Sequence, residues 1–334
     1  QLLAYCLSII LCVSFTGCME NYLDLYPEDK ITSASFPENE SDIKLLLNGV
    51  YAQLREKEVY NQGLFGFGIT DGATPNAFNW GTDEVFNKLG AGRLSSSDGG
   101  VVTYRWKRCY EIISRANYLL ACMDLVDLSE EAKAKYSGET HFLRGLAYSV
   151  LAETYGGVPI ILTDISTEEA RSLKRASLEE TWQQALDDYE VAITNLGVDA
   201  PEPGRATKGA ALGMKMRAYL YQGKYKEVLA CVEQIDALKK YGLFHSYEGL
   251  FDPANENNKE VLFDIQYIEG ENSQGSYIDQ YCGTGTGSWT RGSRYVPTDD
   301  LVAAYETIDG SPVDPENPYE NRDPRLGFTA VLPG

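Results

Sequence analysis

The chain has 334 residues, of which 43% are hydrophobic and 23% are charged, so its composition is that of a folded globular protein. Its 49 acidic and 29 basic side chains give a formal net charge of −20. A surface this negative repels phosphate backbones, which bind proteins chiefly through Lys and Arg, and the charge therefore argues against nucleic-acid binding. The two histidines, His141 and His245, are too few for a histidine-rich metal site.

The first residues have the pattern of an export signal. An uncharged apolar run spans Leu2–Phe15, which is shorter than the about 20 residues of a membrane-crossing helix and has the length of a signal-peptide core. Two small residues then precede Cys18, as in a bacterial lipobox, although Phe15 stands where that motif usually has an aliphatic residue. The pattern predicts a lipoprotein signal over residues 1–17, lipidation of Cys18 and a mature domain over residues 18–334. A plainly cleaved secretory signal is the alternative.

The first part of the mature chain predicts a helix followed by a helix pair. Between Ile43 and Leu54, apolar residues recur at intervals of three and four, which places them on one face of a helix. The same spacing occurs in Trp106–Leu120 and in Phe142–Leu151. We expect these two segments to form an antiparallel pair, joined by the polar stretch Asp124–Lys135.

A second group of helices follows. Ser177 with Glu180 matches a capping box, in which each residue satisfies a free backbone N–H group at the start of a helix. Thr207 is placed to cap the next helix, which is expected to end at Gly223. Residues 224–238 predict one more helix after a very short turn.

The turn between these last helices resembles that of a tetratricopeptide repeat. Tyr219, Gly223 and Tyr225 fit its pattern, in which the glycine permits the turn and the aromatic residues pack two helices together. Two helices end in similar sequences, at Tyr155–Gly157 and Tyr221–Gly223, about 66 residues apart, which is roughly two repeats of 34. The sequence therefore predicts a mostly α, tetratricopeptide-like helical repeat scaffold. A simple helical bundle is the alternative.

Non-helical segments interrupt this scaffold and predict a few short strands. Val158–Leu162 is a short apolar run, and Glu260–Tyr267 alternates like a strand. Two loop-rich stretches, Gly63–Gly100 and Gly270–Arg294, combine glycine and polar residues with aromatic residues. Long irregular segments of this kind are often functional, so we expect them to form a ligand-binding face.

The two loop-rich stretches contain the residue types that bind sugars. A sugar ring has an apolar C–H face edged by hydroxyl groups, so its site needs flat aromatic rings and polar groups at the rim. Trp80 and Trp289 are the candidate stacking residues. The candidate ligand-binding residues around them are Asp71, Asn79, Tyr277, Tyr281 and Arg291. The alternative role of such aromatic residues is to attach the loop to the body, and Trp106 and Trp182 are expected in the core.

The cysteines of the mature chain do not indicate a metal site or a disulfide framework. Cys109, Cys122, Cys231 and Cys282 are widely spaced and form no C-x-x-C motif. Cys109 and Cys122 are predicted on one helix, too far apart for a bridge. Single buried thiols are therefore expected.

Short motifs along the whole chain have the order and spacing found in one known family. They are Tyr22–Pro27, Trp106 with Tyr110–Ile113 and Ala116–Asn117, Glu139 with Phe142–Arg144, Tyr155–Pro159, Gly204–Ala210, Pro297–Thr298, Leu301–Val302 before Asp309–Gly310, and Arg322–Arg325. In this arrangement the chain resembles the SusD/RagB family of surface-exposed, nutrient-binding lipoproteins of the outer membrane.

The resemblance implies a helical repeat scaffold with a ligand-binding loop face, and a binder rather than an enzyme. It also implies a partner, a SusC-like TonB-dependent outer-membrane receptor, to which an oligosaccharide is handed on. Family members usually extend well beyond their Arg-Asp-Pro-Arg segment, here Arg322–Arg325, so a C-terminal portion is expected to be missing from the chain.

No motif indicates catalysis, and no catalytic residue, cofactor or metal is predicted. The chain lacks a G-x-S-x-G sequence and a P-loop, and adjacent acids such as Asp187–Asp188 mark no particular catalytic pair. Asp309–Asp314 does not follow the twelve-residue calcium-loop pattern. The predicted function is capture of glycans by a lipid-anchored protein at the cell surface and their delivery to the transporter. A binder of peptides or another nutrient, and less so a glycoside hydrolase, are the alternatives.

Overall fold

The computed structural model describes residues 36–55, 71–79, 88–95, 97–267, 295–330 and 332. Six longer helices form the body of the described part: α2 (Glu40–Tyr51), α4 (Val101–Cys122), α5 (Glu130–Tyr155), α7 (Leu178–Asn195), α8 (Lys208–Tyr221) and α9 (Tyr225–Ala237). The shorter helical elements are η1 (Ala52–Arg55), α6 (Thr167–Ser172), α10 (Tyr247–Leu250), η3 (Pro253–Asn255), α12 (Asp299–Ala304) and α13 (Arg325–Thr329).

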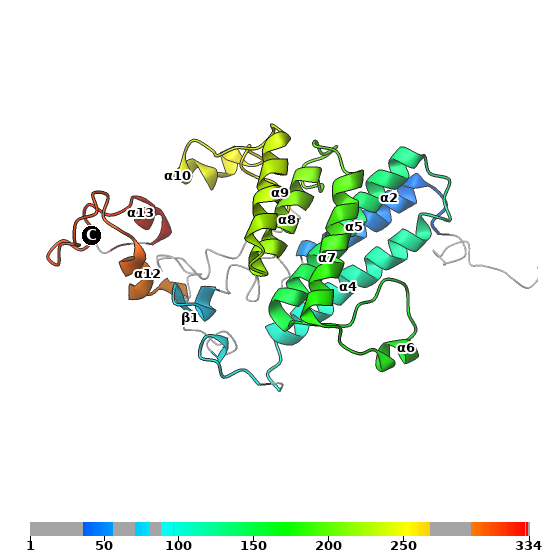
Figure 1. Ribbon diagram of the computed structural model, residues 1–334, viewed down its shortest axis with the longest axis horizontal. Helices are drawn as coiled ribbons and strands as arrows, with labels where there is room; N and C mark the ends of the chain where they lie inside the picture. Colours follow the sequence, from blue (N-terminus) through cyan, green and yellow to red (C-terminus); the bar gives the residue numbers. More distant parts are fainter. Residues whose placement is uncertain are drawn as a thin grey trace, which may run out of the picture.

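The longer helices lie side by side in an array (Figure 1). Helix α5 contacts α2, α4, α7 and α8, and the order continues from α7 to α8 and from α8 to α9. The hydroxyl of Tyr155, at the end of α5, donates to the carbonyl of Val102, at the start of α4, so these two helices are antiparallel. The predicted mostly α, repeat-like scaffold is confirmed.

Side-chain caps explain where the helices begin. The predicted capping box of Ser177 and Glu180 opens α7, and the Thr207 side chain accepts a hydrogen bond from the N–H of Ala210 at the start of α8. The predicted connector Asp124–Lys135 is too long, because α5 already begins at Glu130. The Ser129 side chain accepts a hydrogen bond from the N–H of Ala132 and so caps that helix. Glu130 and Glu131 in its first turn interact favourably with the positive end of the helix dipole.

The turn between α8 and α9 differs in one respect from its expected form. Gly223 has a φ of +69°, a conformation that glycine adopts at little cost, and the N–H of Lys224 donates to the carbonyl of Tyr219. Tyr219 packs against the core as expected. The expectation for Tyr225 is wrong, because its side chain is 68% exposed on α9.

The core surrounds α5, which is buried on most of its circumference. Phe142 and Tyr148 of this helix are fully buried, as is Tyr189 on α7. Gly145 allows α7 to approach closely, since a Cβ atom there would lie 3.0 Å from side-chain atoms of Asp188 and Tyr189. Close approach places the polar groups of both helices within hydrogen-bond reach.

Both tryptophans predicted in the core lie there. Trp182 is 5% exposed. Trp106 is partly buried and packs edge to face on Tyr155, with the ring centroids 5.2 Å apart. Aromatic pairs of this geometry add to the energy of burial, so both rings contribute to the helical scaffold rather than to a ligand-binding surface.

The two segments singled out as possible strands are not strands. Val158–Leu162 has irregular backbone whose polar groups bond to helix side chains: the hydroxyl of Tyr148 donates to the carbonyl of Ile161 and accepts from its N–H, at 2.9 and 2.8 Å. Glu260–Tyr267 is also irregular. Side chains of other elements form the hydrogen bonds of these backbone groups, and the residue pattern within the segment cannot indicate such partners.

The described strands form a small sheet between distant segments. Strand β1 (Ala77–Asn79) pairs antiparallel with β2 (Tyr295–Pro297), with Phe78 opposite Val296. Short strands were expected, but neither of these segments was singled out for one. Their pairing joins segments that are more than 200 residues apart, which a pattern within either segment does not reveal.

The predicted state of the cysteines can be compared with the described residues. Cys109, Cys122 and Cys231 are free and buried, as expected, and Cys282 lies outside the described residues. Burial raises the pKa of the Cys109 thiol to about 12, so this group is an inert part of the core. Among the described helices, none is long and apolar enough to cross a membrane.

Candidate ligand-binding site

Most of the predicted ligand contacts lie outside the described residues. These are Trp80, Tyr277, Tyr281, Trp289 and Arg291, together with the lipidation site Cys18. Asn79 is described through its backbone, as the last residue of β1. Asp71 is exposed, and its backbone carbonyl accepts hydrogen bonds from the N–H and the hydroxyl of Thr74, at 2.8 and 2.7 Å. Its carboxylate therefore lies on an ordered turn that leads into β1.

The β1–β2 sheet brings the two loop-rich stretches together. Asn79, which directly precedes Trp80, pairs with Tyr295, four residues after Arg291. The pairing continues beyond the strands, because the N–H of Thr298 donates to the carbonyl of Asn76 at 3.1 Å. The sheet thus joins a part of the Gly63–Gly100 stretch to the residues that directly follow the Gly270–Arg294 stretch.

The described segments that precede these stretches also lie close together. Residues 56–70 follow Arg55, and residues 268–294 follow Tyr267. Arg55 and Gln266, the neighbour of Tyr267, line the same pocket, so the two chain segments lie near each other.

A groove extends from this point between the loop before α8 and residues 257–266. It consists of two adjoining pockets of about 290 and 270 Å³ that share Glu202–Arg205, Phe263 and Asp264. One pocket is also lined by Arg55 and Gln266, beside which the loop-rich stretches depart.

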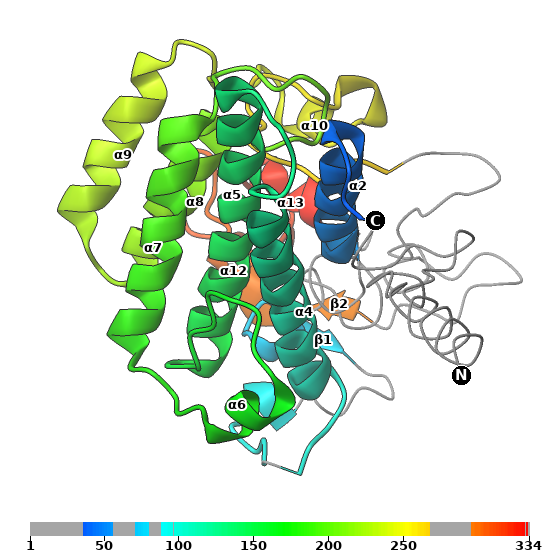
Figure 2. The same ribbon diagram turned by 90° about the vertical axis from the view of Figure 1, so that its right-hand side faces the viewer.

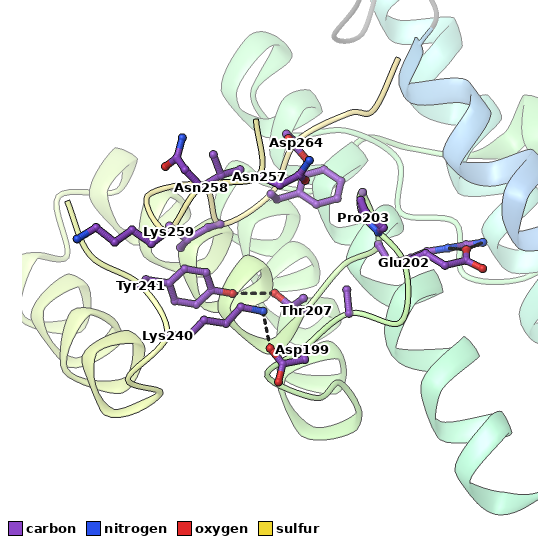
Figure 3. Close-up of a pocket in the computed structure, with 16 residues that line it drawn as sticks. Asp199, Glu202, Pro203, Thr207, Lys240, Tyr241, Asn257, Asn258, Lys259 and Asp264 are labelled. Carbon is purple, nitrogen blue, oxygen red and sulfur yellow. Dashed lines mark hydrogen bonds and ion pairs between the residues drawn. The ribbon is translucent and has the colours of Figure 1, made fainter. Parts of the chain in front are cut away.

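The far end of the groove is closed by side-chain contacts (Figure 3). The hydroxyls of Tyr241 and Thr207 lie 3.1 Å apart, and the Nζ of Lys240 lies 2.9 Å from the carboxylate of Asp199. Tyr241 packs over Gly209, where a Cβ atom would lie 2.3 Å from the ring. The groove therefore offers hydrogen-bonding groups and the aromatic rings of Tyr51, Tyr241 and Phe263.

A buried cluster fixes the wall of the groove. The Tyr51 hydroxyl donates to the carboxylate of Glu139 at 2.8 Å and accepts from the N–H of Ala206 at 2.9 Å. Arg205 lies over the Tyr51 ring, 5.0 Å from its centroid, and donates to the Asn48 side chain. Burial raises the pKa of Glu139, while the Tyr51 hydroxyl and the Arg205 charge act in the opposite direction. The cluster ties α2 and α5 to the loop before α8.

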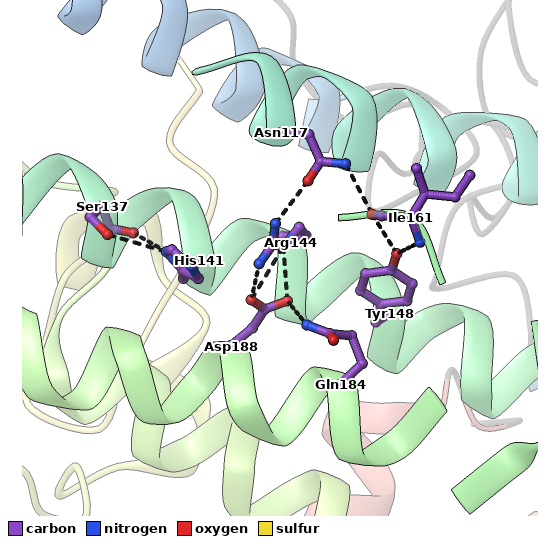
Figure 4. A network of polar contacts seen from close by, with 8 residues as sticks. All are labelled: Asn117, Ser137, His141, Arg144, Tyr148, Ile161, Gln184 and Asp188. Atoms are coloured by element: carbon purple, nitrogen blue, oxygen red, sulfur yellow. Dashed lines mark hydrogen bonds and ion pairs between the residues drawn. The ribbon is translucent and has the colours of Figure 1, made fainter. Parts of the chain in front are cut away.

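A second buried network holds the helices together (Figure 4). The guanidinium of Arg144 on α5 donates to both carboxylate oxygens of Asp188 on α7, with a shortest distance of 2.7 Å. It also donates to the side-chain oxygen of Asn117 on α4 at 2.8 Å, and Asn117 in turn donates to the carbonyl of Ile161. Gln184 donates to Asp188. These contacts are in the core and serve structure rather than ligand binding.

His141 lies beside this network (Figure 4) and is expected to make the stability depend on pH. Burial lowers the pKa of its imidazole below the usual 6.5, and its Nδ1 bonds to the carbonyl of Ser137 at 2.8 Å. As the pH falls from about 7 to about 5.5, the unfolded chain binds this proton first, so the free energy of unfolding decreases. We expect His141→Gln to weaken this decrease in urea titrations at several pH values. The exposed His245→Gln is the control, and equal pH profiles for the wild type and His141→Gln would contradict the prediction.

Sequence reasoning did not identify the groove as a site. Arg205, Tyr241 and Asp264 were not candidates, because their segments show neither a glycine-rich loop nor a dense group of aromatic residues. The motif Gly204–Ala210 pointed to this region of the chain, but no ligand-binding role was assigned to it. Gly204 has a φ of +80°, and its position between the two pockets shows that the motif shapes the groove wall.

The fold and sequence place the chain in a known family. Residues 21–220 match the model of SusD-like proteins that is described as "Starch-binding associating with outer membrane". Because this match covers more than half of the chain, the protein belongs to the SusD-like family, as its motifs predicted.

Curated relatives carry the same family name. SusD-like protein P25 of Formosa agariphila is 27% identical over 312 residues, which cover 86% of this chain and 57% of that protein. A SusD-like protein of Bacteroides ovatus is 24% identical over 278 residues, which cover 76% and 48%. The chain thus spans about half the length of the curated relatives that it matches.

Solved structures have the same fold. A SusD-like carbohydrate-binding protein from Bacteroides fragilis matches with a TM-score of 0.76 and 28% identity, over 86% of this chain and 59% of that one. A laminarin-binding SusD-like protein matches with a TM-score of 0.63 and 23% identity, over 68% and 51%. The second likeness is one of fold alone.

Proposed function

We propose that the protein binds glycans at the cell surface and delivers them to a SusC-like TonB-dependent transporter in the outer membrane. Lipidation of Cys18, after removal of residues 1–17, would attach it to that membrane. The main support is the β1–β2 sheet, which joins the two stretches that carry Trp80 and Trp289. Membership of the SusD-like family and the names of its carbohydrate-binding relatives agree with this function.

The proposed mechanism is capture without covalent chemistry. Trp80 and Trp289 stack on the apolar faces of sugar rings, and Asp71, Asn79, Tyr277, Tyr281 and Arg291 bond to the hydroxyls at their rims. The β1–β2 sheet pairs Asn79, beside Trp80, with Tyr295, so parts of the two stretches are brought to one place before a ligand arrives. Such preorganisation reduces the entropy lost on binding.

The experiment is affinity electrophoresis of the mature chain, from residue 19 and including any residues that follow Gly334 in the natural protein, through gels that contain a panel of polysaccharides. We expect one polysaccharide to retard the wild type, and Trp80→Ala or Trp289→Ala to reduce the retardation at least about tenfold in apparent affinity, because each removes a stacking surface. Tyr225→Ala, an exposed aromatic residue on α9, is the matched control.

The alternatives give different results. Wild-type retardation that both tryptophan variants retain, while folded by circular dichroism, would contradict the proposed site. A protein that no polysaccharide retards would redirect the proposal to peptides or another nutrient. Reducing ends released from a polysaccharide by the purified protein would establish the glycoside hydrolase instead.

A further inference from the structure

A second group of aromatic rings is exposed where α10 approaches α13. Tyr247 is 45% exposed, Phe251 is 70% exposed and Phe328 is 53% exposed. The Tyr247 ring centroid lies 5.4 Å from that of Phe251 and 6.3 Å from that of Phe328. Both ribbon views place α10 beside α13 (Figures 1 and 2). We refer to Tyr247, Phe251 and Phe328 as the aromatic platform.

The backbone beneath the platform is held in place on the α10 side by local hydrogen bonds. The Ser246 hydroxyl caps α10 by accepting from the N–H of Gly249 at 3.0 Å. The side-chain amide of Asn255 donates to the carbonyl of Gly249 at 2.8 Å. The short helix that carries Tyr247 is therefore fixed at both ends without burial of its ring.

The α13 side is held by a buried arginine. Arg322 is 7% exposed and donates to the carbonyls of Val302, Tyr305 and Pro318. Leu326 of α13 is 1% exposed, whereas Phe328, two residues on, is directed outward. The platform thus consists of exposed rings on a secured backbone.

Charged groups lie at the edge of the platform. The guanidinium of Arg325 binds the carboxylate of Asp323, with its Nε 2.9 and 3.0 Å from the two oxygens, and its side chain is 58% exposed. Arg325 and Phe328 are three residues apart on α13, a spacing that places both side chains on the same face of a helix. Donors and acceptors therefore face solvent beside the rings.

This combination suits a sugar better than an apolar protein surface. Exposed aromatic groups of this kind mark interaction sites. An apolar partner would have to remove Arg325 and Asp323 from water, and the desolvation of such charges costs more than their mutual attraction repays in many cases. A sugar ring offers an apolar face to the rings and hydroxyls to the charged pair. The net charge of −20 favours a neutral ligand over an acidic one.

We propose that the aromatic platform, with Arg325, is a second carbohydrate-binding site of this protein, separate from the site at the β1–β2 sheet. The proposal rests on the proposed function, which supplies the class of ligand. A long neutral polysaccharide that contacts both sites binds more tightly than a short oligosaccharide, because the second contact is intramolecular.

The test compares long and short ligands of the same sugar. Phe251→Ala and the double variant Phe251→Ala/Phe328→Ala are run through gels that contain the retained polysaccharide, with Tyr225→Ala as the matched control. We expect the double variant to lose at least about tenfold in apparent affinity for the polysaccharide. Binding of a short oligosaccharide of the same sugar, measured by calorimetry, should depend on Trp80 and stay within about twofold of the wild type in the platform variants.

The outcomes separate this proposal from the proposed function. If Trp80→Ala abolishes retardation and the platform variants migrate as the wild type does, the second site is refuted and glycan binding stands. A wild-type protein that no polysaccharide retards overturns both. If Phe251→Ala lowers the thermal midpoint of the ligand-free protein by several degrees more than Tyr225→Ala does, the ring packs against another part of the chain and the second site is refuted.

Discussion

Asp188→Ala is expected to lower the free energy of unfolding by about 3–5 kcal/mol, because it leaves the Arg144 guanidinium buried without its carboxylate. The side chains of this pair are 7% and 1% exposed, and their contact joins α5 to α7. Loss of a buried partner costs far more than loss of a surface ion pair, since water cannot replace it. Urea denaturation followed by circular dichroism measures the change.

The neighbouring residue provides the control. Asp187 is exposed and accepts a hydrogen bond from Gln183 on the same helix, so Asp187→Ala should change the stability by less than about 0.5 kcal/mol. A double variant, Arg144→Met with Asp188→Leu, removes both charges together and should recover a large part of the loss. Equal small effects of Asp187→Ala and Asp188→Ala would show that the buried pair does not stabilise the fold.

Phe142→Ala is also expected to cost about 3–5 kcal/mol of stability, since it leaves a cavity at the centre of the core. The Phe142 ring is fully buried and packs edge to face on Phe263, with the centroids 4.9 Å apart. Phe263 lines both pockets of the groove. The cavity should therefore also increase amide hydrogen exchange in residues 261–266, which form that wall.

A substitution at the surface tests whether these effects come from the core position or from shortening any large side chain. Leu125 follows α4 and is 72% exposed, so Leu125→Ala should alter neither the unfolding midpoint nor the exchange of residues 261–266. If Phe142→Ala lowered the stability while exchange in that segment stayed at the wild-type rate, the core and the groove wall would be independent.

The helices and many of their ends were predictable because their signals are local. A capping box such as Ser177 with Glu180, and the glycine turn at Gly223, act between residues a few positions apart, and an apolar face repeats within a single helix. The start of α5 was placed too late, because the polar residues after Ser129 resembled a connector. Polar residues are favourable in the first turn of a helix, where acidic groups interact with the helix dipole, as well as in a solvent-exposed loop.

The strands were not predictable from local patterns. Val158–Leu162 is apolar, yet Tyr148 and Thr181 from two helices occupy its backbone polar groups. Conversely, β1 and β2 are only three residues long each, and each has its partner in a distant segment. Strand pairing is a contact between segments, so its energy does not appear in the pattern of either one.

The sequence by itself determined the helical repeat scaffold, the family and the two stretches proposed to bind ligand, because periodicity, caps and motifs are properties of neighbouring residues. The tertiary structure alone decided which distant groups meet: Asn79 with Tyr295 in the sheet, and Tyr247 with Phe328 on the aromatic platform. The groove wall around Arg205 arose in the same way. These contacts form only when packing of the helices has closed the long loops between them, and the energy gained by burial in the core offsets the entropy lost in that closure.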